Sequence, residues 1–289
     1  MSDATSDSGA TLTMRRAWPP RSMVIGGAIV LVLAILAMLG PWIAPHDPTA
    51  FAVRLRFSPP VAAHPFGTDE FGRDVFSRVL VGARFSFAMG FGATAISLLL
   101  GVPLGLIAAF HRGVVDEMIM RLLDLLISLP PILLGLLILA VTPPSLWKTI
   151  VTVGIVYVPI LARLTRSVAL GLLEEDFVMA ARARAEGATS ILLREILPNA
   201  WPPIIVESGL RITFAILLGS SLSFLGLGPQ PPSSEWGLMI SESRQFISQA
   251  PWIGLAPGLS LGVLLVSINV FGEGLREFLD PRLLGRSHG

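Results

Sequence analysis

The stretch EEDFVMAARARAEGATSILLREILPN, residues 174–199, is the most charged part of a chain that is otherwise strongly apolar. Of the 289 residues, 53% are hydrophobic and only 14% are charged, whereas a soluble domain carries about 25% charged residues. The mean hydropathy is +0.72. We therefore expect a membrane protein in which a compact polar segment lies between two membrane-spanning stretches.

Local signals divide this polar segment into two short helices. Acidic residues stand where the first helix would begin, and negative charge there complements the helix dipole; they are Glu174, Glu175 and Asp176. Alanines then favour a helix that runs through Ala185, and Gly187 permits a turn. A second helix over residues 191–197 is expected to end at Pro198.

One face of the first helix is small and flat. Phe177, Ala180, Ala181 and Arg184 follow the spacing of residues that share a helix face. A solvated loop has no use for an exposed stripe of this kind, so the pattern favours docking of a partner. Packing of the helix against the chain's own membrane helices explains the same pattern equally well.

Long runs without charged residues predict six membrane spans, since a crossing helix needs about 20 mostly apolar residues. The fourth run is short, but the stems of Arg163 and Arg166 let their charges reach the interface and extend it to about residue 168. We start the fifth span near Trp201, because Glu207 and Arg211 stand four residues apart and can pair. The runs are 22–53, which leaves the membrane near Pro45, then 85–111, 125–147, 149–162, 212–234 and 245–272.

These spans divide the chain into a tail (1–21), a first span (22–44), an external segment (45–84) and a core (85–289) with five spans and the polar loop 171–200. In the external segment, apolar residues alternate with Arg73, Arg78 and Arg84, which predicts an amphipathic helix at the membrane surface. A simple extension of the second span explains that alternation equally well.

An even number of spans places both termini on one side of the membrane, and the distribution of basic residues selects the side. Thirteen basic residues fall on the side of the polar loop: Arg15, Arg16, Arg21, Arg112, Arg121, Arg163, Arg166, Arg182, Arg184, Arg194, Arg276, Arg282 and Arg286. Seven fall on the other: Arg54, Arg56, Arg73, Arg78, Arg84, Lys148 and Arg244. The positive-inside rule therefore predicts cytoplasmic termini and a cytoplasmic polar loop.

Several features near the membrane are expected to shape the bundle. Pro130 and Pro131 in the third span and Pro159 in the fourth remove helix hydrogen bonds and can kink those helices. The stretch GVPLG, residues 101–105, allows two helices to approach closely. The loop 225–253, which contains Trp236, is rich in glycine and proline and should lie outside the membrane.

Several chemical functions find no support in the sequence. There is no cysteine, and the four histidines (His46, His64, His111 and His288) are too scattered to suggest a metal cluster. A net charge of +1 gives no reason to expect nucleic acid. The single lysine, Lys148, follows no glycine-rich loop, so the chain has no P-loop for ATP.

A membrane enzyme is also poorly supported. The two carboxylates that could form an intramembrane catalytic pair are Asp124 and Glu207. Both stand near the predicted cytoplasmic ends of spans, where charges usually pair. Pairing with Arg121 or another interface group explains Asp124 better, and pairing with Arg211 explains Glu207 better. We therefore expect no catalytic residue, no cofactor and no metal ligand.

The polar segment resembles the cytoplasmic EAA loop of binding-protein-dependent ABC importer permeases. The landmarks of that loop are an Ala-Ala pair, a glycine four residues later and a Leu-Pro end, and Ala180, Ala181, Leu197 and Pro198 match them. Met179 occupies the glutamate position and Ala185 the glycine position, with Gly187 two residues further on. The resemblance implies an ATPase-coupling role for ten residues: Glu175, Asp176, Phe177, Ala180, Ala181, Arg182, Arg184, Gly187, Leu197 and Pro198.

Three more stretches narrow the family. HPFGTDEFGRDVFSRVLVGAR (64–84), FLGLGPQPPSSEWGLMI (224–240) and GEGLREFLDPRL (272–283) resemble the second permease subunit of dipeptide, oligopeptide and nickel importers. The resemblance implies an all-α type I ABC importer permease with six transmembrane helices in the bacterial inner membrane.

The same resemblance implies the partners and the mechanism. A sister permease, two cytoplasmic ATPase subunits and a periplasmic or lipid-anchored binding protein would act with this chain. Together they would pass a small solute, a di- or oligopeptide, across the membrane by alternating access. The alternative is a membrane enzyme or an autonomous channel that uses the polar loop as a scaffold.

Overall fold

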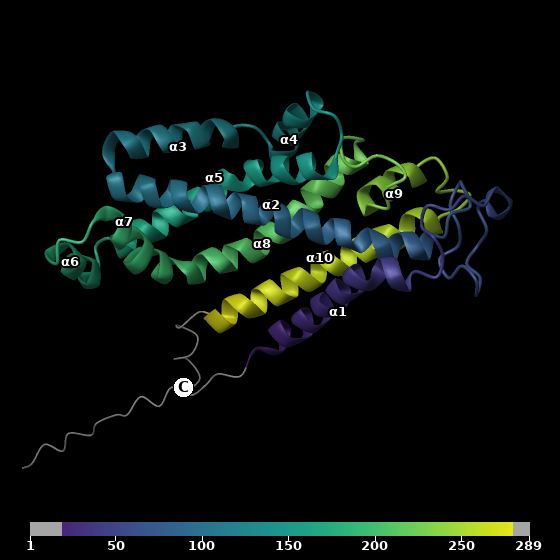
Figure 1. Cartoon of the computed structure of the whole chain (residues 1–289), viewed down its shortest axis with the longest axis horizontal. Helices are drawn as coiled ribbons and strands as arrows, with labels where there is room; N and C mark the ends of the chain where they lie inside the picture. Colours follow the sequence, from purple (N-terminus) through teal and green to yellow (C-terminus); the bar gives the residue numbers. More distant parts are fainter. Residues whose placement is uncertain (1–18, 280–289) are drawn as a thin grey trace, which may run out of the picture.

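The computed structural model describes residues 19–279, which form a bundle of long helices (Figure 1). Paired strand residues in this part of the chain are confined to two isolated bridges, Val61 with His64 and Thr68 with Asp74. Five helices are long and apolar enough to cross a membrane. They are α1 (Arg21–Ile43), α2 (Val75–His111), α5 (Leu146–Leu172), the helix Ala188–Phe224 that includes α8 (Leu197–Phe224), and α10 (Trp252–Leu279).

The expected third span, residues 125–147, is not one straight helix. Helix α3 (Gly113–Ile127) and helix α4 (Pro131–Ala140) are bent by 87° at the break between them, and the pair counts as a sixth span only if taken together. Proline disfavours helical geometry in the residue before it, and Pro130 is itself extended before Pro131, the first residue of α4. The two prolines thus turn the chain more sharply than a kink within a continuous helix.

Helix α2 replaces the expected surface helix of the external segment. It begins at Val75, with the side chain of Asp74 accepting a hydrogen bond from the Ser77 N–H, and continues unbroken to His111. The alternative, an extension of the second span, is therefore the one that forms. Arg78 is buried beside an acidic residue and does not reach a polar surface, which is why the apolar–basic alternation was misleading.

Helices α2 and α5 pack with their backbones almost in contact. A Cβ atom added to Gly105 would lie 2.4 Å from the carbonyl oxygen of Ala162, and one added to Gly101 would lie 2.9 Å from that of Val158. The GVPLG stretch therefore allows the close approach that its small residues predict. Helix α8 packs against both α2 and α5, and α10 packs against α1 and α8.

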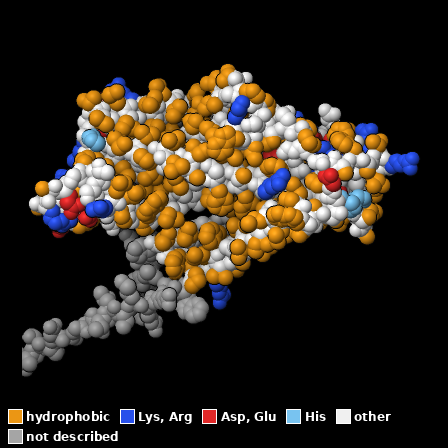
Figure 2. All heavy atoms as spheres, viewed as in Figure 1, with side chains coloured by type: hydrophobic (Ala, Val, Ile, Leu, Met, Phe, Trp, Pro, Cys, Tyr) orange, Lys and Arg blue, Asp and Glu red, His pale blue; other side chains and the backbone are white. Residues whose placement is uncertain are grey.

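The two ends of the bundle differ in character. Helix α6 (Asp176–Ala183) lies at one end, toward which α1 begins and α10 finishes, while helix α9 (Trp236–Ser243) and residues 44–74 lie at the other (Figure 1). Hydrophobic side chains dominate the middle of the face in Figure 2, where some Lys or Arg side chains also lie, and acidic side chains are seen mainly toward the two ends. We call these ends the α6 end and the α9 end.

We predict that Gly105→Leu prevents normal assembly of the bundle. The added side chain meets the α5 backbone, which cannot move away as a flexible side chain could, so the free energy of unfolding should fall by at least about 1–3 kcal/mol. The thermal unfolding midpoint of the purified protein measures this loss. Gly262→Leu in α10 is the matched control, because a Cβ there meets nothing within 4 Å; equal destabilisation by the two variants would contradict the proposed role of the contact.

Candidate functional site

The polar segment forms a compact helical turn at the α6 end. Helix α6 begins at Asp176 with Glu175 as its N-cap, as the acidic residues predict. After the turn, a short helix α7 (Ala188–Ser190) passes into a π-helical segment, η2 (Ile191–Ile196), and then directly into α8. The second half of the polar segment is therefore continuous with the N-terminal end of the long helix α8 and does not form a separate hairpin.

The turn itself differs from the expected one. Helix α6 ends at Ala183, and Ala185 adopts a left-handed conformation with φ of +58°. The N–H of Glu186 donates to the carbonyl of Ala181 at 3.2 Å and that of Ala185 to Arg182 at 2.9 Å, which is the Schellman pattern that usually ends in glycine. The expectation that the helix runs through Ala185 and breaks at Gly187 is wrong.

Gly187 and Pro198 also have different roles from those expected. Gly187 has an extended backbone that any residue adopts, and it precedes α7. Pro198 lies in the first turn of α8 and does not end a helix. The π-type register before it, with the Leu197 N–H donating to Leu192, accommodates the missing proline N–H, and the Asn199 side-chain amide donates to the Glu195 carbonyl at 2.6 Å.

The expected docking face of α6 is divided between the interior and the surface. Ala181 and Val178 are fully buried and pack in the same hydrophobic cluster as Leu173, Ile191 and Ile196. Phe177 and Leu197 pack against this cluster from its edge. Ala181 therefore fixes α6 to the bundle, as the alternative of internal packing predicts, and it is not available to a partner.

A different face of α6 is turned outward. Asp176, Met179, Ala180 and Ala183 are all exposed, at positions that share one side of the helix. The Met179 side chain is 57% exposed although it is apolar. We call these four residues the α6 outer face; Arg182 is exposed beside it.

Arg184 stabilises the turn from within the chain. Its guanidinium donates to the Glu186 carboxylate at 2.7 Å and lies 3.5 Å from Glu195. Glu186 also accepts a hydrogen bond from the Ser190 hydroxyl at 2.9 Å. The bond from Arg184, and then that from Ser190, lower the pKa of the Glu186 carboxyl. The Arg184 side chain is therefore engaged across the turn that follows α6.

At the α9 end, the loop after α8 is held down by buried polar contacts. Trp236 is buried and its indole N–H donates to the Val79 carbonyl at 3.0 Å. Glu235 caps α9 by accepting from the N–H groups of Gly237 and Leu238, and burial raises the pKa of its carboxyl. The neighbouring Ser234 is buried too.

A buried ion network, which the sequence analysis did not identify, joins the segment 44–74 to α9. The Asp69 carboxylate accepts from Arg73 and from Arg78, each at 2.6 Å. Arg78 also reaches Glu242 in α9 at 3.2 Å and the Ser233 carbonyl at 3.1 Å. The sequence feature that could have indicated this network is the high density of acidic residues and arginines in TDEFGRDVFSR, residues 68–78.

The two candidate carboxylates of an intramembrane enzyme are each paired with an arginine. Asp124 pairs with Arg163 of α5, and Glu207 pairs with Arg211 at 2.8 Å, as the four-residue spacing predicts. Asp124 was expected to pair with Arg121 or another interface group, and Arg121 instead pairs with Glu117. Neither carboxylate is thus arranged to share a proton with the other.

Comparison with protein families gives two matches. The family described as "Binding-protein-dependent transport system inner membrane component" matches residues 101–285. The family described as "N-terminal TM domain of oligopeptide transport permease C" matches residues 20–60. Together the two matches begin at the first helix and reach beyond the last described residue, and residues 61–100 lie between them.

Individual proteins agree with these matches. The chain is 42% identical to the dipeptide transport system permease protein DppC of Alkalihalophilus pseudofirmus, over 90% of this chain and 86% of the relative. It is 37% identical to the glutathione transport system permease protein GsiD of Pectobacterium atrosepticum, over 90% and 87%. The solved structure of the MetNI methionine ABC transporter in inward-facing conformations shares the fold, with a TM-score of 0.58 at 17% identity over 70% of this chain and 96% of that one.

We predict that Ala185→Gly stabilises the turn after α6. A left-handed alanine costs about 1–2 kcal/mol, and glycine removes most of that strain at a smaller entropic cost, so the local gain should be up to about 1 kcal/mol. Limited proteolysis of the segment 176–196 measures local opening, and cleavage should slow several-fold. Ala183→Gly, within α6, is the matched control and should speed cleavage; faster cleavage of Ala185→Gly as well would contradict the role of the left-handed turn.

Proposed function

We propose that this chain, which belongs to the family of binding-protein-dependent transport system inner membrane components, passes a dipeptide or oligopeptide across the inner membrane by alternating access. It is a multi-pass inner-membrane permease subunit of an ABC importer and not an enzyme. Membership in this family implies ATPase and binding-protein partners. The alternative of a membrane enzyme or an autonomous channel is thereby set aside.

The assignment of a peptide substrate rests on the 42% identity with a dipeptide permease over 90% of this chain. The glutathione permease, which matches over a similar share, also has a short peptide as its named solute. Both relatives match with nearly their whole length, so the agreement includes the external segment as well as the spans. A short peptide is the chemical class that the solutes of these two relatives have in common.

The substrate assignment is tested by uptake. A strain that lacks this gene should lose uptake of a radiolabelled dipeptide and regain it when the gene is restored on a plasmid. Competition by unlabelled dipeptides, longer peptides and glutathione then ranks the solutes. Normal dipeptide uptake in the deletion strain, with loss of an unrelated solute, would refute the peptide assignment.

We propose that the α6 outer face docks on one of two cytoplasmic ATPase subunits. Met179 and Ala180 give an exposed apolar centre, and Asp176 and Arg182 flank it with charge, which is the usual make-up of a small protein interface. The buried Ala181 side supports this role by fixing the helix to the bundle. A sister permease, paired with this chain as a heterodimer, would complete the path.

We propose further that the α6 end is cytoplasmic and the α9 end external, with both termini cytoplasmic. The thirteen basic residues on the side of the polar loop support this orientation. Helices α1 and α10 lie side by side and antiparallel, so that α1 begins and α10 ends toward the same end of the bundle, the α6 end (Figure 1).

The docking role predicts the effect of one substitution. Ala180→Glu places a large charged group on the α6 outer face, where burial against a partner would cost several kcal/mol without an ion pair. Substrate-stimulated ATP hydrolysis and uptake by the reconstituted transporter should fall at least tenfold while the chain still inserts. Ala180→Ser, which keeps the residue small, is the matched control and should retain coupling.

Normal coupled transport by Ala180→Glu would show that the α6 outer face does not dock. The buried Ala181 is not used for this test, because Ala181→Glu would place a charge in the hydrophobic cluster and unfold the turn. Assembly of the Ala180→Glu chain with its partners, judged by size-exclusion chromatography, separates lost coupling from lost folding.

The orientation is tested by single cysteines, since the chain has none of its own. Gln230→Cys lies on an exposed position of the loop before α9, and Thr189→Cys on an exposed position of α7. An impermeant thiol reagent should label Gln230→Cys in intact spheroplasts and Thr189→Cys only after permeabilisation. The reverse pattern would invert the proposed topology.

A further inference from the structure

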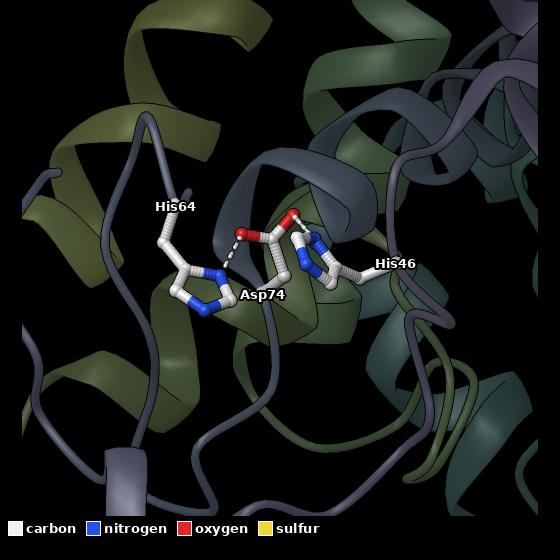
Figure 3. A group of neighbouring side chains, drawn as sticks. All are labelled: His46, His64 and Asp74. Atoms are coloured by element: carbon white, nitrogen blue, oxygen red, sulfur yellow. Dashed lines mark hydrogen bonds and ion pairs between the residues drawn. The ribbon is translucent and has the colours of Figure 1, made fainter. Parts of the chain in front are cut away.

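Two histidines far apart in the sequence meet one aspartate at the α9 end (Figure 3). His46 lies just beyond the end of α1, His64 lies in a short turn of the external segment, and Asp74 caps α2. Both imidazole rings present Nδ1 to the carboxylate, His64 at 2.9 Å from Oδ1 and His46 at 3.7 Å from Oδ2. The scattered positions of these histidines in the chain gave no sign of this arrangement.

The spacing of the three side chains suits a tetrahedral metal ion. Ligand bonds of about 2.0–2.2 Å to zinc place neighbouring donor atoms about 3.4 Å apart in a tetrahedron. The two measured separations from Asp74, 2.9 and 3.7 Å, lie on either side of this value. All three donor atoms lie within 4.8 Å of one another, so small side-chain rotations suffice to surround an ion.

The carboxylate is held in place by groups that are not ligands. Asp74 Oδ2 accepts from the Ser77 N–H at 2.8 Å and from the Ser77 hydroxyl at 2.6 Å. The same hydroxyl accepts a hydrogen bond from the backbone N–H of His46 at 3.1 Å. Ser77 thus orients the carboxylate and one histidine backbone together, which is how outer partners fix the ligands of metal sites.

A simple hydrogen bond accounts for only part of the geometry. A His64 N–H donating to Asp74 at 2.9 Å explains that pair alone. The His46 ring lies 4.6 Å from the His64 ring, centroid to centroid, and its Nδ1 faces the carboxylate from beyond hydrogen-bond distance. A cation between the three donor atoms would make use of all of them.

We propose that His46, His64 and Asp74 form a site for a divalent ion of the zinc, nickel or copper class. Two imidazoles and one carboxylate select such ions over Mg²⁺ and Ca²⁺, which prefer oxygen ligands alone. The His46 side chain is 42% exposed, against 12% for His64. Solvent therefore reaches the three donor atoms from the side of His46.

The bound ion would crosslink three segments at the α9 end. It joins the end of α1, the turn of the external segment and the start of α2, and adds metal–ligand bonds to contacts such as the hydrogen bond from the His46 N–H to Ser77. The metal site faces the external medium only if the orientation proposed above, with the α9 end outside, is correct. The binding of the ion itself does not, and it is measurable in detergent.

The test is zinc binding by the complete transporter containing this chain. The complex is stripped with a chelator and dialysed against micromolar ZnCl₂, and its zinc content and thermal unfolding midpoint are measured. His46→Gln is compared with His111→Gln, an exposed histidine at the opposite end of α2. We expect one more zinc per complex in the wild type and in His111→Gln than in His46→Gln, and at least tenfold weaker binding in His46→Gln.

Two further measurements strengthen the test. Asp74→Asn keeps a good N-cap for α2 but removes the charge, so it should fold and lose the zinc-dependent rise of the unfolding midpoint. A hundredfold excess of Mg²⁺ should not displace the zinc. Equal zinc content and equal affinity in the wild type and in His46→Gln would overturn the proposal, since any sites on the partner chains are common to both complexes.

Discussion

The backbone-to-backbone contact between α2 and α5 is the constraint on which the rest of the structure depends. Lipid chains are as apolar as leucine side chains, so hydrophobic burial does not drive helices together within the membrane, and close packing through small residues takes its place. Gly101 and Gly105 bring α2 against the α5 carbonyls, and Gly154 of α5 accepts Ile96 of α2 in return. The two helices thus form a unit against which α8 packs.

The α2–α5 pair connects the α9 end of the molecule to the α6 end. At its α9 end, α2 begins at Val75 with Asp74 as its N-cap, next to the buried network of Asp69, Arg73 and Arg78. Burial of such charges is costly unless each is paired, and here one carboxylate serves two guanidinium groups. At the α6 end, α5 leads through Leu173, itself buried, directly into α6. A change at one end therefore meets a continuous packed structure, not a flexible linker.

Sequence patterns predicted the features that depend on composition and local spacing. The apolar runs located α1 and α5 to within a few residues and overlapped α8 and α10, whose ends lie up to ten residues from the expected ones. They missed the start of α2 and the bend of α3 and α4. The acidic residues located the start of α6, and the four-residue spacing predicted the Glu207–Arg211 pair. The signals that failed depend on tertiary context. Propensity placed Ala185 in a helix, but the chain needs a left-handed residue there so that α6 can fold back on Ile191.

The same distinction explains two arrangements that the sequence did not predict: the burial of Ala181 and the meeting of His46 with His64. Helical spacing showed that Ala180 and Ala181 are neighbours on α6, but it did not show which of them the bundle covers, and the structure covers Ala181. His46 and His64 are 18 positions apart and meet only because the external segment folds back over the start of α2. Contacts of this kind follow from the path of the chain and leave no periodic trace in the sequence.

The packing of α6 determines how a force on its outer face would travel. Val178 and Ala181 share one hydrophobic cluster with Ala109 of α2, Ala169 of α5 and Ile204 of α8. Interiors of this kind are close-packed and transmit displacement without deforming gradually. If α6 moves, the ends of α2, α5 and α8 that pack in this cluster must therefore move with it, unless the cluster opens at a cost of several kcal/mol. Because Ala181 is small and buried, α6 lies close to the bundle, and a force on the α6 outer face would reach three membrane helices at once.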